Sequence, residues 1–424
     1  MLEKFKKFWS LKDLRNKILL TILMLLVARF AAHIPIPGID VSKLEQFFQG
    51  NQFLGLLDLF SGGTLSKFSI VLMGVAPYIN ASIIIQLLTM ILPKLEALSK
   101  EGEEGRRKIN QYTRLLTVPL AALQAYGMMV FLSQGDQPLL GTLDFTAVFS
   151  LLVVGTAGTI FLMWLGELIT QLGIGNGMSL LITLGIIAGM PGAIRNIAVV
   201  LDPSRAWSAV FLVAILVLEV WGITFVQEAT RNIPVSYARR VRGGQLVGGV
   251  STHLPIRVNV AGVIPIIFAL SLMLFPDMIG NFLSQAQTPW IAESAKAVTK
   301  FFQNQLYYGI IYFALVIGFT FFYTSIVFKP TDIAENLQKQ GGFIPGLRPG
   351  SQTSDYLKFV ILRINVFGSI FLGLIAILPF VLKAMTGINT LVISGTGILI
   401  LVSVVLETMR QIRAQIAMRS YEIS

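Results

Sequence analysis

The stretch FLGLLDLFSGGTLSKFS, residues 53–69, stands directly before the long apolar run 68–93. Its own apolar part is too short to cross a membrane, because a helix of about ten residues rises only ~15 Å against a hydrocarbon core of ~30 Å. Asp58, the glycine pair at 62–63 and Lys67 interrupt it. A broken backbone at membrane depth is tolerated only inside protein or beside a water-filled cavity. If this stretch lies at membrane depth, it therefore requires a cavity.

The composition indicates a membrane protein around such a cavity. Of 424 residues, 54% are hydrophobic and 13% are charged, whereas soluble chains carry about 25% charged residues. Cysteine is absent, which excludes disulfides and thiolate metal sites. The two histidines, His33 and His253, are too far apart in the sequence to suggest a metal site.

Ten apolar runs are long enough to span a bilayer. They lie near 17–34, 68–93, 114–133, 147–167, 178–197, 208–227, 260–279, 307–328, 359–382 and 391–409. We predict an all-α polytopic membrane protein with ten transmembrane helices, and Pro77 is expected to kink the second. Residues 1–200 and 201–424 carry five runs each. An odd number of spans gives the two halves opposite orientations, as in inverted repeats whose pathway lies at the interface.

The basic residues predict the orientation. Most of the 33 lysines and arginines fall in the N-terminal segment, in the loops after runs two, six and eight, and in the C-terminal tail. The positive-inside rule then places both termini in the cytoplasm. The N-terminal segment MLEKFKKFWSLKDLRNK is predicted to be a basic amphipathic helix on the membrane surface, with a plain charged leader as the alternative. The opposite side carries Lys43, Lys67, Arg195, Arg205, Lys296, Lys300 and Lys383.

Two loops on the basic side, about 228–258 and 329–358, are longer than a connection needs. They are rich in glycine, proline and arginine. Such loops suggest a docking surface for a large partner, either ribosomal RNA or an acidic protein surface. The alternative is that they only determine topology and contact lipid headgroups.

The span interiors are nearly free of charge, which weighs against a proton-coupled carrier. Arg29 lies towards the outer end of the first run and Glu219 lies in the sixth. The nucleotide motif GxxxxGK[ST] does not occur, and GIGNG (173–177) is predicted to be a tight turn that starts a helix. No nucleophile or metal constellation stands out. Of three classes considered, a secondary transporter and a membrane enzyme are disfavoured against a passive channel without a cofactor.

The second run carries polar residues that are unusual against lipid: Asn80, Ser82 and Gln86. Polar side chains in hydrocarbon bind neighbouring helices or water. At 3.6 residues per turn, the three cannot share one narrow stripe. Interhelical hydrogen bonds that hold a bundle are the structural alternative to a functional role.

Several long motifs follow one another in a fixed order over essentially the whole chain. They are IPIPGID (34–40), FSGG (60–63), PYINASIIIQLL (77–88), EGEEGRRKINQYTR (101–114), FLMWLGE (161–167), GIGNGMS (173–179), STHLPIRVN (251–259), AGVIPIIFA (261–269) and GFIPGLRPG (342–350). On these motifs the chain closely resembles the SecY family, the large subunits of bacterial protein-conducting channels.

The resemblance implies an hourglass channel between two five-helix halves in the bacterial cytoplasmic (inner) membrane. Unfolded preproteins cross through the middle, and signal sequences leave sideways into membrane lipid. The lateral gate lies between helices 2–3 and 7–8, and Asn80, Ser82 and Gln86 are expected to line it. The implied partners are a small SecE subunit, a SecG-type subunit, and either the ATPase SecA or a translating ribosome.

The resemblance also assigns a pore ring of aliphatic side chains. The matching positions are Val75, Ile79, Ile182, Ile267 and Ile400. Val75 departs from the isoleucine that is commoner there. A narrow aliphatic neck excludes water and ions by dewetting, and it offers a sliding polypeptide no hydrogen-bonding site.

The resemblance further implies that the stretch 53–69 contains the plug, a short re-entrant helix over about 53–67 that seals the ring from the outer side. The plug residues are Leu56, Leu57, Leu59, Phe60, Ser61, Gly62, Gly63, Thr64 and Leu65. On the cytoplasmic side, the residues expected to bind SecA or the ribosome are Arg239, Arg240, Arg242 and Arg348.

Overall fold

The computed structural model describes residues 12–36, 63–65, 67–133, 145–200, 206–237, 240–242, 245–247, 251–283, 288–386 and 395–423. Within these residues the chain is mostly helical. The helices of its first half are α2 (Lys12–Ala31), α5 (Ala76–Ile91), α6 (Pro93–Lys100), α7 (Glu103–Ser133), α8 (Phe145–Leu172) and α9 (Gly177–Val200).

The second half adds seven helices and five short strands in the described residues. The helices are α10 (Ala206–Glu228), α11 (Ile264–Leu283), α12 (Pro289–Gln303), α13 (Gln305–Val327), α14 (Pro330–Lys339), α15 (Ser351–Thr386) and α16 (Thr396–Ile423). The strands are β1 (Thr230–Tyr237), β2 (Arg240–Arg242), β3 (Gln245–Val247), β4 (Ser251–Arg257) and β5 (Gly342–Phe343).

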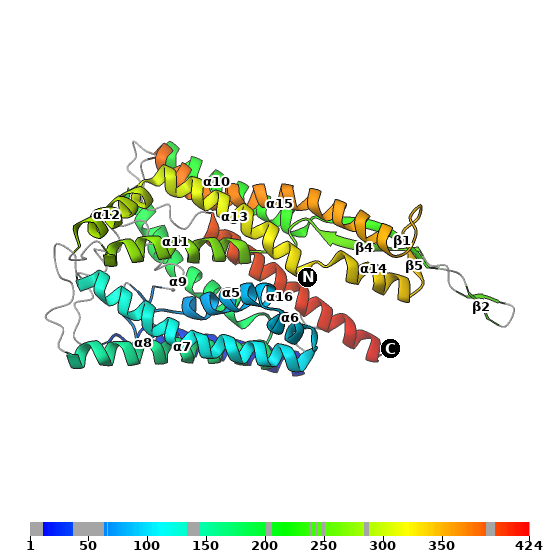
Figure 1. Ribbon diagram of the computed structural model, residues 1–424, viewed down its shortest axis with the longest axis horizontal. Coiled ribbons are helices and arrows are strands. Elements are labelled where there is room, and N and C mark those ends of the chain that lie inside the picture. Colours follow the sequence, from blue (N-terminus) through cyan, green and yellow to red (C-terminus); the bar gives the residue numbers. More distant parts are fainter. Residues whose placement is uncertain are drawn as a thin grey trace.

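The long helices run along the long axis of the molecule (Figure 1). The strands, α6 and α14 gather at one end, which we call the sheet end, and α12 lies at the opposite end. Each of the ten apolar runs overlaps one helix. Among the described residues, three segments are long and apolar enough to cross a bilayer by themselves: Val148–Leu172, Gln305–Lys339 and Ser351–Leu382. A fourth is added if α5 and α6, which are bent by 101°, count as one span.

The second apolar run is not one kinked helix, so the prediction for Pro77 was wrong. Residues 67–75 form turns, and α5 begins only at Ala76 with Pro77 in its first turn. Proline suits that position because the first helical N–H groups have no partner within the helix. The backbone of the turns is bound by a distant segment instead: Ile36 N–H donates to Phe68 O (2.9 Å) and Ile70 N–H donates to Ile34 O (3.0 Å).

The apolar cores largely follow the two halves of the chain. One cluster, from Ile36 to Leu151, belongs to the first half, and another, from Ile223 to Leu399, belongs to the second. A third cluster joins them. It unites residues of α2, α8 and α9 with Ile400 and Val404 of α16, and α16 contacts both α9 and α10.

The two long basic loops contain a small sheet that the sequence reading did not predict. Strand β1 pairs antiparallel with β4, from Thr230 opposite Arg257 to Ser236 opposite Ser251, and also pairs with β5 of the other loop. Side chains alternate along β1, so that Ile233 and Val235 are buried. Both loops thus share one apolar core at the sheet end.

Candidate functional site

The five residues predicted to form a ring come together in one apolar cluster. Val75, Ile182 and Ile400 are 6%, 5% and 1% exposed. Ile79 and Ile267 are partly buried and pack against the same cluster. They are brought there by the start of α5, by α9, by α11 and by α16, which are far apart in the sequence. The structure therefore places aliphatic side chains of both halves in one apolar cluster.

Val75 is the residue that precedes α5, and the turns of 67–75 deliver it. Gly74 has a φ of +56°, a conformation that glycine adopts without strain. Gly158 of α8 lies directly against these turns, because a Cβ built on it would stand 2.0 Å from Ile70 O. The backbone of α8 therefore determines how far Val71 and Val75 extend into the cluster.

Ile182 is placed by the GIGNG turn, and the prediction that this turn starts a helix is confirmed. The turn is held from two other helices. Ile174 N–H donates to Thr21 Oγ1 of α2 (3.1 Å), and Gly175 N–H donates to Gln411 Oε1 of α16 (3.0 Å). A side chain at Gly177 would collide with Gly166 O of α8. The start of α9 is thus fixed against three neighbouring helices.

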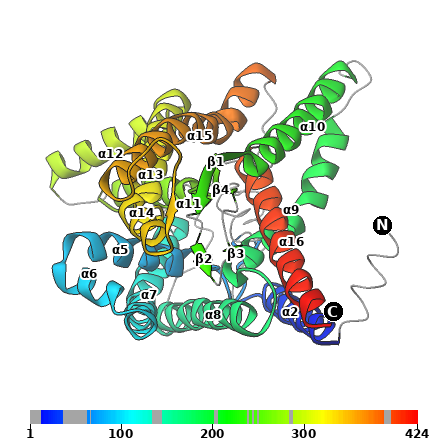
Figure 2. The ribbon, with the colours of Figure 1, turned by 90° about the vertical axis from the view of Figure 1, so that its right-hand side faces the viewer.

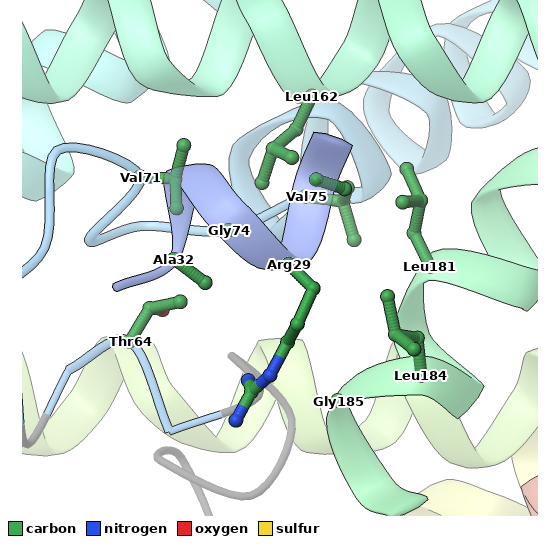
Figure 3. Close-up of a pocket in the computed structure, with 11 residues that line it drawn as sticks. Arg29, Ala32, Thr64, Val71, Gly74, Val75, Leu162, Leu181, Leu184 and Gly185 are labelled. Atoms are coloured by element: carbon green, nitrogen blue, oxygen red, sulfur yellow. The ribbon is translucent and has the colours of Figure 1, made fainter. Parts of the chain in front are cut away.

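A small pocket adjoins the cluster (Figure 3). Its water-accessible space is about 40 Å³, which is room for a few water molecules. The described residues that line it are Ala28, Arg29, Ala32, Thr64, Val71, Gly74, Val75, Leu162, Leu181, Leu184 and Gly185.

Arg29 is the one charged side chain among the described residues of this pocket, and sequence reasoning gave it no role. Its guanidinium extends between Thr64 on one side and Leu184 on the other (Figure 3). The sequence signal that could have identified this position is an arginine within an apolar run, because ionisable residues in spans are rare and usually face a cavity.

Only the end of the predicted plug lies within the described residues. Leu65 is 4% exposed and packs with Ile36 and Phe68. The Thr64 hydroxyl donates to Leu72 O (3.3 Å), and Thr64 also lines the pocket. Gly63 has a φ of +76°. The other predicted plug residues lie outside the described residues: Leu56, Leu57, Leu59, Phe60, Ser61 and Gly62.

The predicted gate residues divide between two faces of α5, as their spacing indicated. Gln86 Nε2 donates to Ser82 Oγ (3.2 Å), so these two share a face. Asn80 is 3% exposed and lies on another face. Asn80 Oδ1 and Gln86 Oε1 are buried and accept no hydrogen bond from the described residues. Helix α11 contacts both α5 and α7 on this side of the bundle.

Of the four arginines predicted to dock a partner, Arg348 is described most fully. Its side chain is exposed, whereas its backbone is held: its N–H donates to Gln352 Oε1 (3.3 Å), and its carbonyl accepts from Thr353 Oγ1 (3.0 Å). Gly346 and Gly350 on either side have φ values of +85° and +102°. The GLRPG loop thus presents the arginine from a rigid backbone.

The other three arginines belong to the loop between β1 and β4. Arg240 and Arg242 lie on β2, which pairs antiparallel with β3, and only the backbone is described there. Arg239 lies outside the described residues. Strand β2 projects beyond the rest of the sheet end (Figure 1), so the backbone of Arg240 and Arg242 lies far from the helices.

Comparison with known proteins identifies the family of this chain. The family model described as SecY matches residues 69–409. The protein translocase subunit SecY of Halalkalibacterium halodurans is 44% identical over 435 residues, which cover 100% of this chain and 99% of that protein. A solved structure of a protein-conducting channel aligns with a TM-score of 0.65 at 18% identity and covers 95% of this chain and 92% of that one.

A Sec61 chain from a canine ribosome–channel complex of the endoplasmic reticulum has a TM-score of 0.62 at 17% identity, with the same coverage. At such identities, the two solved structures support the fold alone. The family model covers residues 69–409, the relative covers the whole chain, and both ranges include the positions of the predicted ring. The chain belongs to the SecY family.

Proposed function

We propose that this chain is the pore-forming subunit of a protein translocase, which conducts unfolded polypeptides across the cytoplasmic membrane of a bacterium. The observation that carries the proposal is the convergence of five aliphatic side chains from both halves at one cluster. Membership of the SecY family supports the same role. The subunit is a channel rather than an enzyme.

Ten transmembrane helices in two inverted halves form the channel. The overlap of every apolar run with a helix supports this arrangement, as does the separation of two cores along residues 1–200 and 201–424. Both termini lie in the cytoplasm, because the basic loops of the sheet end mark the cytoplasmic side. The α12 end then faces outwards.

The ring seals the resting pore by its chemistry. Aliphatic side chains at a narrow neck disfavour water, and without water ions do not pass. The plug, about 53–67, closes the neck from the outer side. Thr64 supports this position, because it belongs to the plug and lines the pocket beside Val75.

Hydrophobic segments leave through the side of the pore between α5–α7 and α11–α13. Leucine or isoleucine at mid-membrane contributes about −0.5 kcal/mol, whereas a charge costs about +3 kcal/mol. A segment of ~20 apolar residues therefore gains several kcal/mol on entering lipid. The buried amide oxygens of Asn80 and Gln86 favour opening, since water or a passing backbone would provide the hydrogen bonds that they lack among the described residues.

The energy comes from a partner that docks on the sheet end, either SecA or a translating ribosome. The rigid presentation of Arg348 and the shared core of the two loops support a preformed docking surface. The fold shared with Sec61 of a ribosome–channel complex is consistent with a ribosome as partner. A SecE subunit and a SecG-type subunit complete the complex.

The test is reconstitution of the purified chain with SecE and SecG-type subunits in liposomes. With SecA and ATP, an unfolded preprotein should become protected from added protease inside the vesicles. The same preprotein locked in a folded state by a bound ligand serves as the control and should stay accessible. The proposal would be overturned if the unfolded preprotein stays accessible to protease although all subunits are present and folded.

A further inference from the structure

Helix α12 differs from the other long helices in direction and in surface. It lies at the end opposite the strands (Figure 1) and projects sideways beyond α11 and α13 when the molecule is viewed from the sheet end (Figure 2). It contacts both of these helices. Its 15 residues give it a length of about 22 Å. The proposed function gives α12 no role.

The inner face of α12 is fixed to α11 by small residues. Ala295 is 6% exposed and Thr299 is 8% exposed. A Cβ on Gly280 of α11 would stand 2.4 Å from Thr299 Oγ1, so the two helices are in close contact there. The opposite face of α12 is therefore the one left for another partner.

That outer face has an apolar edge and a charged edge. Trp290, Val298 and Phe301 are 68%, 42% and 44% exposed, and at 100° per residue they fall on one edge. Lys296 and Lys300 are one turn apart on the other edge, near Glu293, and all three are exposed. Among the described residues, neither lysine makes an ion pair.

The apolar edge continues onto α13. The rings of Phe301 and Tyr307 stack with centroids 4.8 Å apart and planes 13° apart. Leu306 and Ile310, which follow on α13, are 65% and 59% exposed. They belong to a segment apolar enough to cross a bilayer. One exposed apolar surface thus runs from a membrane span onto α12.

We propose that α12 lies in the headgroup region of the outer leaflet, with its apolar edge inserted beside the acyl chains. Lys296 and Lys300 bind the phosphates of anionic phospholipids. Aromatic residues and lysines on a helix with two such edges are typical of interfacial helices. The outer side is otherwise poor in basic residues, so two lysines one turn apart are not explained by topology. The proposal uses the membrane orientation of the proposed function and goes beyond it.

The first experiment measures depth, and it uses the absence of native cysteine. Ser294→Cys, between Trp290 and Val298 on the apolar edge, carries a nitroxide in the complete complex in nanodiscs. We expect the label to be relaxed by oxygen, which enters lipid, and protected from a water-soluble nickel chelate. A label at Glu335→Cys, on the exposed surface of α14 at the sheet end, should show the reverse. Equal access of the chelate to both labels would mean that α12 projects into water, towards an aqueous protein partner, and would overturn the proposal.

The second experiment titrates the lipid. The phosphatidylglycerol fraction is raised, and the spectrum of the Ser294→Cys label reports when α12 becomes immobilised. Each lysine near an anionic surface contributes a factor of about 5 in affinity, so Lys296→Gln with Lys300→Gln should raise the midpoint several-fold. Arginine at both positions, which keeps the charge, should leave it unchanged. An unchanged midpoint in the glutamine pair would contradict the phosphate contacts. Neither readout requires polypeptide transport, so failure of the proposed function would be seen separately.

Discussion

A substitution at Gly158 should displace a residue of the proposed ring without changing any ring residue. In the structure this glycine of α8 faces the turns of 67–75, which carry Val75 into the apolar cluster. We predict that Gly158→Ala lets ions through the resting channel. The substitution adds a single methyl group, so it changes neither charge nor polarity.

The size of the perturbation follows from the contacts. The new Cβ would stand 2.0 Å from Ile70 O and 3.0 Å from Val71 Cα, whereas ordinary contact begins at 3.4 Å. The turn must therefore move by about 1.4 Å. Overpacking of this kind costs about 1–3 kcal/mol, partly offset by the ~1 kcal/mol by which alanine favours a helix over glycine. If 1–2 kcal/mol remains against the sealed state, the population of unsealed channels rises by a factor of about 5–30.

The assay is chloride leak from proteoliposomes that hold the complete complex without substrate. Gly155→Ala is the matched control, because it lies one turn earlier on α8 and its Cβ would meet Ala125 Cβ at an ordinary 3.5 Å. We expect leak to rise for Gly158→Ala and to stay at the wild-type level for Gly155→Ala. Equal leak in the two variants, with both complexes folded, would refute the reasoning that α8 positions the ring.

Three further predictions test the ring, the gate and the docking surface. Ile182→Asn puts an amide into the apolar cluster and should raise the resting chloride leak several-fold; wild-type leak would show that Ile182 does not seal the pore. Gln86→Leu removes the hydrogen bond to Ser82 and should shift the hydrophobicity threshold at which test segments enter lipid. Ser82→Ala is the comparison, because it removes the same bond and keeps the Gln86 amide. An unshifted threshold in Gln86→Leu would contradict the gate role. Arg348→Glu should slow SecA-driven transport by about tenfold, equivalent to ~1.4 kcal/mol, at an unchanged thermal midpoint, whereas Arg348→Lys should retain most of it; transport at the wild-type rate in Arg348→Glu would remove this arginine from the docking surface.

The positions of the apolar helices could be predicted from the sequence, because an apolar run of about 20 residues has few alternatives in a bilayer. Helix α12, which has charged residues on one edge, was not predicted. The break before α5 could not be predicted. The run continues through 67–75 without a polar residue between Ser69 and Asn80 except Tyr78. What prevents a helix there is pairing with the distant backbone of Ile34 and Ile36, and such a contact leaves no local pattern.

The sheet was missed for a similar reason. Strands β1 and β4 are short and lie in loops rich in glycine, proline and arginine, where the two buried positions Ile233 and Val235 give only one alternation. Strand β5 has two residues and comes from another loop. The consequence for function is that the two basic loops form one body rather than two independent arms.

Residue patterns alone could not identify the residues of the proposed ring. Val75, Ile79, Ile182, Ile267 and Ile400 are ordinary aliphatic residues in apolar helices, and only the family resemblance selected them. The structure brings them into one cluster. Arg29 differs from these residues, because a charge within an apolar run stands out in the sequence. Its position in the pocket beside Val75 could be learned only from the fold.

The central claim is that a polypeptide passes through this cluster, and cross-linking tests it most directly. Single cysteines replace Ile79, Ile182, Ile267 or Ile400 in turn, and a preprotein with one cysteine is arrested halfway through the channel. All four positions should form disulfides with the arrested chain, whereas a cysteine at Leu218, which is 67% exposed on α10, should form none. The account would be contradicted if the preprotein is demonstrably arrested but the ring positions stay unlinked, or link no better than Leu218. Substrate would then not pass through the ring.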